Sequence, residues 1–274
     1  MIAIVTDSTA PITQKEAEQY GICVVPHSYM TNGIAYLENY TDKNENYTRR
    51  LLAAGTSAST GQSTAAAFAT AFRQLLTQGY EVLCIVISSR LSGAWSSAVT
   101  AAREIGSAKI AVVDSHATAG ALYFQIRMAR ELADSGCPLN ELADHCKSFD
   151  NIAKVAFSVE NMGALRRSRR LGFINQSVNT ILNRRPVFCL EGGSIVSKNL
   201  ARGRGERVRM LSALVPKNAK RLMVQGFGNA PIESSLMRML QRQFPEVEIL
   251  HRELGPVLSI HIGAQALAVS WCLD

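Results

Sequence analysis

Three apolar runs in the first half of the sequence end in polar segments that could bind an anion. The segments are Asp7-Ser8-Thr9, residues 88–93 and Asp114-Ser115-His116. If the runs are parallel strands, these segments gather at the sheet edge where open α/β sheets bind ligands, and each also opens a predicted helix whose first N–H groups favour negative charge. Of the three segments, Ser92-Gly93 gives the strongest indication of an anion site, because the hydroxyl can donate and the glycine lets a ligand approach the backbone. The alternative is that these hydroxyls only cap helices.

A histidine and a second hydroxyl-rich segment could complete such a site. His261 is predicted at the end of an apolar strand over residues 257–261 and is followed by Gly263. Residues 57–64 (SASTGQST) form either a capped loop or another wall of the same site. An isolated histidine is also commonly structural, so both interpretations stay open.

Ser92, His261 and either Asp7 or Asp114 supply the residue types of a Ser-His-Asp hydrolase. The sequence lacks the G-x-S-x-G elbow that presents the nucleophile in α/β hydrolases. A hydrolase remains an alternative because catalytic triads are defined by geometry rather than by sequence spacing.

The positive charge of the chain is concentrated in residues 166–209. The protein carries a net charge of +7, whereas this segment alone carries +9, with ten arginines and one lysine against two glutamates. Arginine is preferred over lysine where two N–H groups grip a phosphate or carboxylate. The segment indicates a docking or phosphate-facing surface, with a solvated face and a nucleic-acid-binding surface as alternatives. The scarcity of interleaved aromatic residues argues against nucleic acid.

The sequence contains no cofactor, metal or membrane signature. Its six cysteines are too widely spaced for a zinc or redox motif, and no Walker A motif is present. Pro231 stands where a G-x-G-x-x-G motif beginning at Gly226 needs its last glycine. The apolar runs fall short of the ~20 residues of a membrane helix, and the N-terminus lacks a signal-peptide pattern. We therefore expect a cytoplasmic protein without metal or cofactor.

The elements that position these residues give an α/β fold, and in the first half of the chain the alternation of strand and helix predicts a mostly parallel sheet. A break near residue 153 divides the 274 residues into an N-terminal Rossmann-like domain (1–153) and a C-terminal α/β domain (154–274). The predicted strands are 2–6, 22–26, 82–87, 109–113, 155–159, 186–190, 221–224, 247–250 and 257–261. The predicted helices are 12–20, 65–76, 94–105, 117–133, 139–149, 162–169, 178–183, 206–214 and 232–243.

Eight segments, in this order, resemble the DegV family of bacterial fatty-acid-binding proteins. They are IVTDSTA (4–10), TGQSTAAAF (60–68), ISSRLSGAWSSA (87–98), VVDSHATAG (112–120), RRSRRLGFI (166–174), LNRRPVF (182–188), ARGRGERVR (201–209) and HIGAQALAV (261–269). Residues 60–64, 168–170 and 263–265 depart from the family's usual T-S-Q-P-S, G-G-R and G-P-G.

The resemblance implies two domains that bury a long-chain fatty acid, such as palmitate, stearate or oleate, in a tunnel between them. The carboxylate-binding residues that it implies are Thr60, Ser92, Gly93 and His261. The docking or phosphate-facing residues that it implies are Arg170, Arg202 and Arg204. It further implies a carrier without catalytic activity, which presents the acyl carboxylate to a separate ATP-dependent fatty acid kinase subunit.

Overall fold

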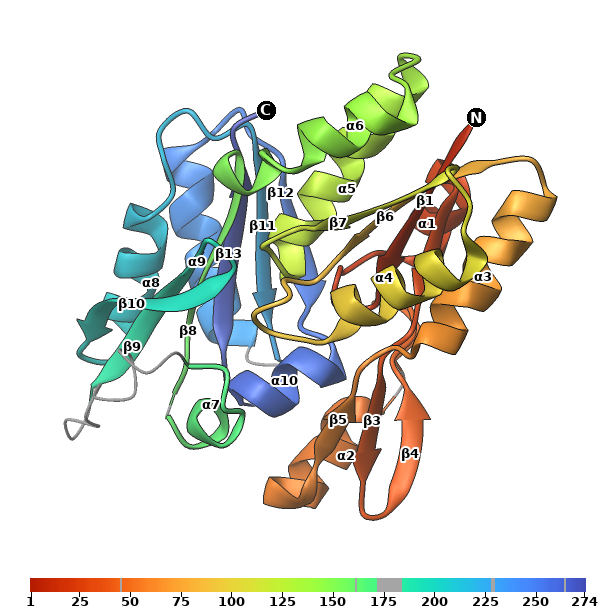
Figure 1. The fold of residues 1–274 in the computed structure, drawn as a ribbon. Coiled ribbons are helices and arrows are strands. Elements are labelled where there is room, and N and C mark those ends of the chain that lie inside the picture. The colour runs from red at the N-terminus through yellow and green to blue at the C-terminus, as the bar shows by residue number, and fades with distance from the viewer. Residues whose placement is uncertain (45, 161, 172–183, 228–229, 264) are drawn as a thin grey trace.

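The computed structural model describes residues 1–44, 46–160, 162–171, 184–227, 230–263 and 265–274. Two large β-sheets lie side by side, with helices between them and on their outer faces (Figure 1). The mixed α/β architecture predicted from the alternation of strands and helices is confirmed.

The first sheet is parallel, with the strand order β2-β1-β6-β7. Its strands are β1 (Ile2–Asp7), β2 (Ile22–Val25), β6 (Glu81–Val86) and β7 (Ile110–Asp114). The helices that accompany it are α1 (Gln14–Tyr20), α3 (Ala65–Thr77), α4 (Ala94–Ile105), α5 (Ala119–Asp134) and α6 (Leu139–Cys146). Strand β6 is almost continuously apolar and buried, as expected for a parallel strand that is covered on both faces.

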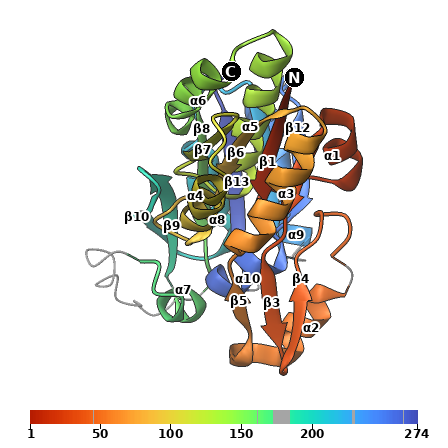
Figure 2. The same cartoon turned by 45° about the vertical axis from the view of Figure 1, so that its right-hand side comes forward.

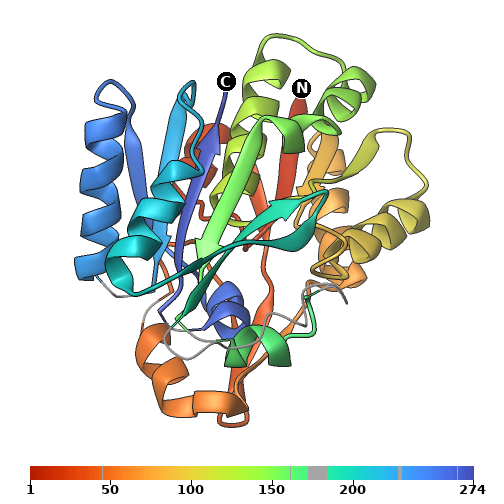
Figure 3. The ribbon, with the colours of Figure 1, turned by 90° about the vertical axis from the view of Figure 1, so that its left-hand side faces the viewer.

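The second sheet is mixed, with the order β10-β9-β8-β13-β11-β12 and only β11 and β12 parallel. Its strands are β8 (Ala153–Ser158), β9 (Arg185–Glu191), β10 (Ser194–Ala201), β11 (Arg221–Gly226), β12 (Ile249–Glu253) and β13 (Leu267–Cys272). Helices α8 (Arg204–Ala213) and α9 (Ala230–Gln243) cover its outer face (Figure 3). The sequence prediction omitted β10 and β13.

Helix α5 is shared by the two sheets, since it packs against β1 of the first and against β8 and β13 of the second. Eight consecutive residues of α5, from Ala119 to Ile126, are buried. A Cβ atom on Gly120 would lie 2.7 Å from the Ser270 side chain, so only glycine allows α5 to approach β13 this closely. The hydrophobic core is consequently continuous between the sheets.

A third, small sheet projects from the body of the molecule (Figures 1 and 2). It consists of β3 (Ser28–Thr31), β4 (Ile34–Leu37) and β5 (Ser59–Gly61), accompanied by α2 (Tyr47–Ala54) and the 3-10 helix Gly55–Ser57. Tyr29 of β3 and Tyr47 and Leu51 of α2 pack in one cluster with Phe227 and Val257. The sequence prediction missed these elements because they are short and several apolar side chains, such as Ile34 and Leu37, are exposed.

Residues 257–261 are helical, and the predicted strand there is wrong. They lie in α10 (Pro256–Ile262), which begins with a proline in its first turn and ends at Gly263 with φ +90°. A short apolar run is compatible with a strand or a buried helix, and the proline at its start is the signal that favours the helix.

The remaining elements are α7 (Gly163–Arg167) and the 3-10 helix Phe149–Asn151. The helix predicted over residues 178–183 lies outside the described residues. Strand β8 begins at Ala153, where the sequence places a domain boundary, and the boundary itself stays a prediction. Among the described residues, we find no helix with the length and apolar character needed to cross a bilayer.

Candidate ligand-binding site

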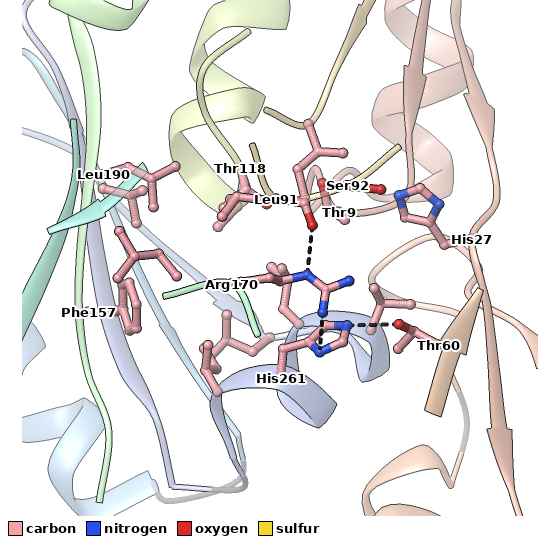
Figure 4. Close-up of a pocket in the computed structure, with 18 of the residues that line it drawn as sticks. Thr9, His27, Thr60, Leu91, Ser92, Thr118, Phe157, Arg170, Leu190 and His261 are labelled. Carbon is pink, nitrogen blue, oxygen red and sulfur yellow. Dashed lines mark hydrogen bonds between the residues drawn. The ribbon is translucent and has the colours of Figure 1, made fainter. Parts of the chain in front are cut away.

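A cavity of about 160 Å³ lies where the first sheet, the second sheet and α10 meet. Figure 4 shows Phe157 and Leu190 at one end of it and His27 and Thr60 at the other. Val155, Ile195 and Ala268 add to the apolar lining, whereas Thr9, Gln62, Ser92, Arg170 and His261 add polar groups. The cavity therefore suits a ligand with one polar and one apolar end.

The carboxyl ends of the parallel strands line this cavity, as the sequence predicts. Thr9 follows β1, Ser92 follows β6, and Thr118 follows β7. The third predicted segment, residues 114–116, does not itself line the cavity, because Asp114 Oδ1 accepts the backbone N–H groups of Ser89 and His116 instead.

Arg170, His261 and Thr60 form a chain of hydrogen bonds at the polar end (Figure 4). Arg170 Nη1 lies 3.0 Å from His261 Nδ1, and His261 Nε2 lies 2.8 Å from Thr60 Oγ1. Arginine can only donate, so Nδ1 accepts and the neutral ring carries its proton on Nε2. His261 therefore donates to Thr60, which leaves the Thr60 hydroxyl proton free to donate to a ligand.

The surroundings keep His261 neutral and Arg170 fixed. Burial, together with the nearby Arg170 and His27, lowers the pKa of His261 to about 3. Arg170 also donates from Nε to the Leu91 carbonyl at 2.7 Å and from Nη1 to the Ser168 carbonyl at 3.0 Å. The polar end thus presents a half-buried guanidinium and hydroxyl groups, which together suit an anion.

Asp7 bonds residues at the ends of two strands and does not line the cavity. Its Oδ1 accepts from the Thr9 backbone and hydroxyl, and its Oδ2 accepts from the Ile87 backbone at 2.6 Å. Burial raises the pKa of Asp7, but His27 and these hydrogen bonds outweigh burial and hold the pKa below its ordinary value. The Asp7 carboxylate therefore links the end of β1 to the residue that follows β6.

Helix α10, which carries His261, is held by the small sheet. Glu38 Oε1 accepts the Val257 N–H at 3.0 Å, and the Tyr47 hydroxyl donates to the Leu254 carbonyl at 2.6 Å. A Cβ atom on Gly255 would lie 2.3 Å from Glu38 Oε1, so glycine is required for this approach. The segment that the sequence prediction missed therefore positions a central site residue.

Gly93 lies beside the cavity without being part of its lining. A Cβ atom there would lie 2.2 Å from Gln62 Oε1, so its glycine makes room for a side chain that does line the cavity. Within residues 57–64, Thr60, Gly61 and Gln62 line the cavity and Thr64 caps α3.

The basic segment is divided between the interior and the surface. Arg170 lines the cavity, whereas the exposed Arg202 and Arg204 do not. Arg207 is fully buried and bonds Glu160 Oε2 at 2.7 Å, and Arg185 pairs with the same carboxylate. The structure thus brings Thr60, Ser92, Arg170 and His261 together and leaves Arg202 and Arg204 apart.

The described residues do not assemble a Ser-His-Asp triad around His261. Both of its ring nitrogens are occupied, by Arg170 and Thr60, and Asp7 and Asp114 bond other groups. No group of three potential metal ligands occurs among the residues that the structure describes.

The fold and the site define an α/β protein with a cavity between its two large sheets that has an apolar and a polar end. A family model described as an uncharacterised protein of the DegV family matches residues 1–274, and the chain belongs to this family. A DegV domain-containing protein of Halalkalibacterium halodurans is 27% identical to it over 279 residues, which cover 100% of this chain and 99% of the relative.

Two solved structures share the fold. A DegV family protein from Thermus thermophilus, described as binding fatty acid, is 27% identical, with a TM-score of 0.85 and 99% of both chains covered. DegV from Bacillus subtilis, described as a fatty acid binding protein, is 23% identical, with a TM-score of 0.88 and coverage of 100% of this chain and 99% of that one. The resemblance inferred from the eight sequence segments is confirmed.

Sequence reasoning missed two features of the site. It gave Arg170 a docking or phosphate-facing role, which stays a prediction, and did not foresee that the guanidinium bonds His261. It also overlooked His27, which is 2% exposed and lines the cavity. The position of His27 directly after the predicted strand 22–26 is the one sequence signal that could have singled it out.

Proposed function

We propose that this protein binds a long-chain fatty acid in the cavity and acts as a carrier rather than as an enzyme. The observation that carries the proposal is the Arg170–His261–Thr60 chain, which leaves a hydroxyl donor at the polar end of an apolar cavity. Fatty acid binding by the Thermus thermophilus relative supports the same ligand class.

The free energy of fatty acid binding agrees with a cavity that has one apolar and one polar end. A C16 chain has ~14 methylene groups, and at ~0.8 kcal/mol each their burial favours binding by about 11 kcal/mol as an upper limit. A cavity of about 150 Å³ accommodates one benzene ring, so a C16 chain requires the walls of this cavity of about 160 Å³ to move apart. Affinity then comes from the chain, while Thr60, Ser92 and His261 set which end lies at the polar groups.

We further propose that the bound carboxylate is presented to a separate ATP-dependent fatty acid kinase subunit in the cytoplasm. Arg202 and Arg204, which are exposed, are the candidate docking residues, and Arg170, which lines the cavity and bonds His261, is the candidate phosphate-facing residue. Neutral donors and a single guanidinium would hold the carboxylate without a tight ion pair, which suits a group that must later be phosphorylated.

Native mass spectrometry of protein purified from a bacterial host, followed by lipid extraction, tests the carrier function. We expect one bound fatty acid of about 14 to 18 carbons per chain, in keeping with a chain that is held mainly by buried methylene groups. Lipid-free protein that also fails to bind added palmitate would refute the proposal. Presentation of the carboxylate is tested by incubating the fatty-acid-loaded protein with a separate fatty acid kinase subunit and ATP. Acyl phosphate is the expected product.

A further inference from the structure

His27 makes an unusual set of contacts for a buried histidine. It follows β2, is 2% exposed and lines the polar end of the cavity together with Ser92 and Thr9 (Figure 4). The Ser63 backbone N–H donates to His27 Nδ1 at 2.8 Å. Because Nδ1 accepts this bond, the ring carries a proton on Nε2. Burial lowers the pKa of His27, but Asp7 outweighs burial and raises the pKa above its ordinary value.

The Nε2–H group of His27 has no hydrogen-bond partner among the described residues. The nearest acidic atom, Asp7 Oδ1, is 3.4 Å away and already accepts from the Thr9 backbone and hydroxyl. An unsatisfied buried donor is costly, and in native proteins such a group calls for an explanation. Here the donor belongs to a side chain that lines the ligand cavity.

We infer that His27 is a second imidazole ligand of the bound head group, with its Nε2–H donating to the carboxylate oxygen that lies away from Thr60. This inference rests on the proposed function. The head group is then held between donors from two sides of the cavity: Thr60, backed by His261 and Arg170, on one side and His27 on the other. Ser63 fixes the tautomer of His27, as Arg170 fixes that of His261.

Two substitutions separate the proposed role from a structural one. In His27→Asn, the amide oxygen can take the place of Nδ1 and keep the Ser63 bond, but the donor at the position of Nε2 is lost. In His27→Gln, the longer amide can place an N–H group near the position of Nε2. His145→Asn, an exposed histidine on α6, is the matched control.

Calorimetric titration with palmitate and with hexadecanol, which has the same chain and no carboxylate, measures the effect on each ligand. A hydrogen bond to a charged acceptor is worth about tenfold in affinity. We expect His27→Asn to weaken palmitate binding by about that factor while hexadecanol binding stays within about twofold, and His27→Gln to recover most of the loss. The thermal midpoint of His27→Asn should stay close to that of the wild type.

Equal loss of palmitate and hexadecanol binding in His27→Asn, or no loss at all, would overturn the assignment while leaving fatty acid binding intact. A wild-type protein that binds neither ligand would overturn the proposed function as well. Nitrogen-15 NMR of the histidine side chains supplies an independent readout: palmitate should shift the His27 Nε2–H signal more than hexadecanol does. An unmoved signal would refute the contact.

Discussion

Glu38 and Val257 are joined by a hydrogen bond in which a buried carboxylate oxygen accepts the backbone N–H of the first turn of α10 at 3.0 Å. The other carboxylate oxygen accepts from the Ser8 hydroxyl at 2.6 Å. One side chain thus ties the end of β1 to the helix that carries His261. The geometry of the head-group end depends on a residue that does not itself line the cavity.

Glu38 should make stability depend on pH. Burial raises its pKa from 4.5 to about 7, despite the opposing effects of Ser8, His27 and Val257. The folded chain holds this proton more tightly than the unfolded chain, so the stability that Glu38 contributes is lost as the pH rises from 4.5 through about 7. Glu38→Gln keeps an acceptor for Val257 without the charge.

We therefore expect Glu38→Gln to exceed the wild type in unfolding free energy by up to about 3 kcal/mol near pH ~8, and by much less near pH ~5. Urea unfolding at both pH values measures the difference. Glu18→Gln, on the exposed side of α1, is the control. A difference that does not change with pH would contradict the prediction.

Arg170→Ala should change the protonation of His261. Burial remains the larger cause of the depressed pKa, so we expect the value of about 3 to rise without reaching 6.5. Without the Arg170 donor, the tautomer that orients Thr60 is no longer fixed, and palmitate binding should weaken about tenfold. NMR titration of His261 and calorimetry measure the two effects. Arg169→Ala, the exposed neighbour, should change neither, and an unaltered His261 titration in Arg170→Ala would refute the coupling.

Thr60→Val removes one hydroxyl and keeps the β-branched shape that suits β5. The variant loses the donor that faces the ligand and leaves His261 Nε2–H without its acceptor. We expect about tenfold weaker palmitate binding with little change in hexadecanol binding. Ser59→Ala, on the same strand, should bind both ligands as the wild type does. Wild-type palmitate affinity in Thr60→Val would exclude Thr60 from the carboxylate site.

Affinity should rise with chain length. Each buried methylene group contributes ~0.8 kcal/mol, which corresponds to about fourfold tighter binding. Titrations with decanoate, myristate, palmitate and stearate should follow this slope if Phe157 and Leu190 move aside for the chain. A plateau at decanoate would mean that the apolar end stays closed and that the ligand is a shorter acid.

The strands of the parallel sheet and the sites at their ends could be predicted because the signals are local. Long apolar runs predict β1 and β6, and the polar residues after them must share one sheet edge. Ser92 follows from this rule alone, whereas Thr60 and the role of His261 came from the family resemblance. The eight matching segments also correctly predicted the family to which the chain belongs.

The remaining features depend on contacts between distant segments. The strand predicted at His261 is a helix because Pro256 starts it and Glu38, far away in sequence, binds its first turn. Nothing near Arg170 in sequence indicates that it points inward to His261. His27 owes its tautomer to Ser63, 36 residues further along the chain.

Helix α5 limits how this protein can be recombined with its relatives. Its buried surface faces both sheets, and Gly120 leaves no space between it and Ser270. A chimera that joins residues 1–153 of this chain to the second half of another member would confront α5 with foreign β8 and β13 strands. A working chimera would therefore have to exchange the residues of both sheets that face α5 together with the helix.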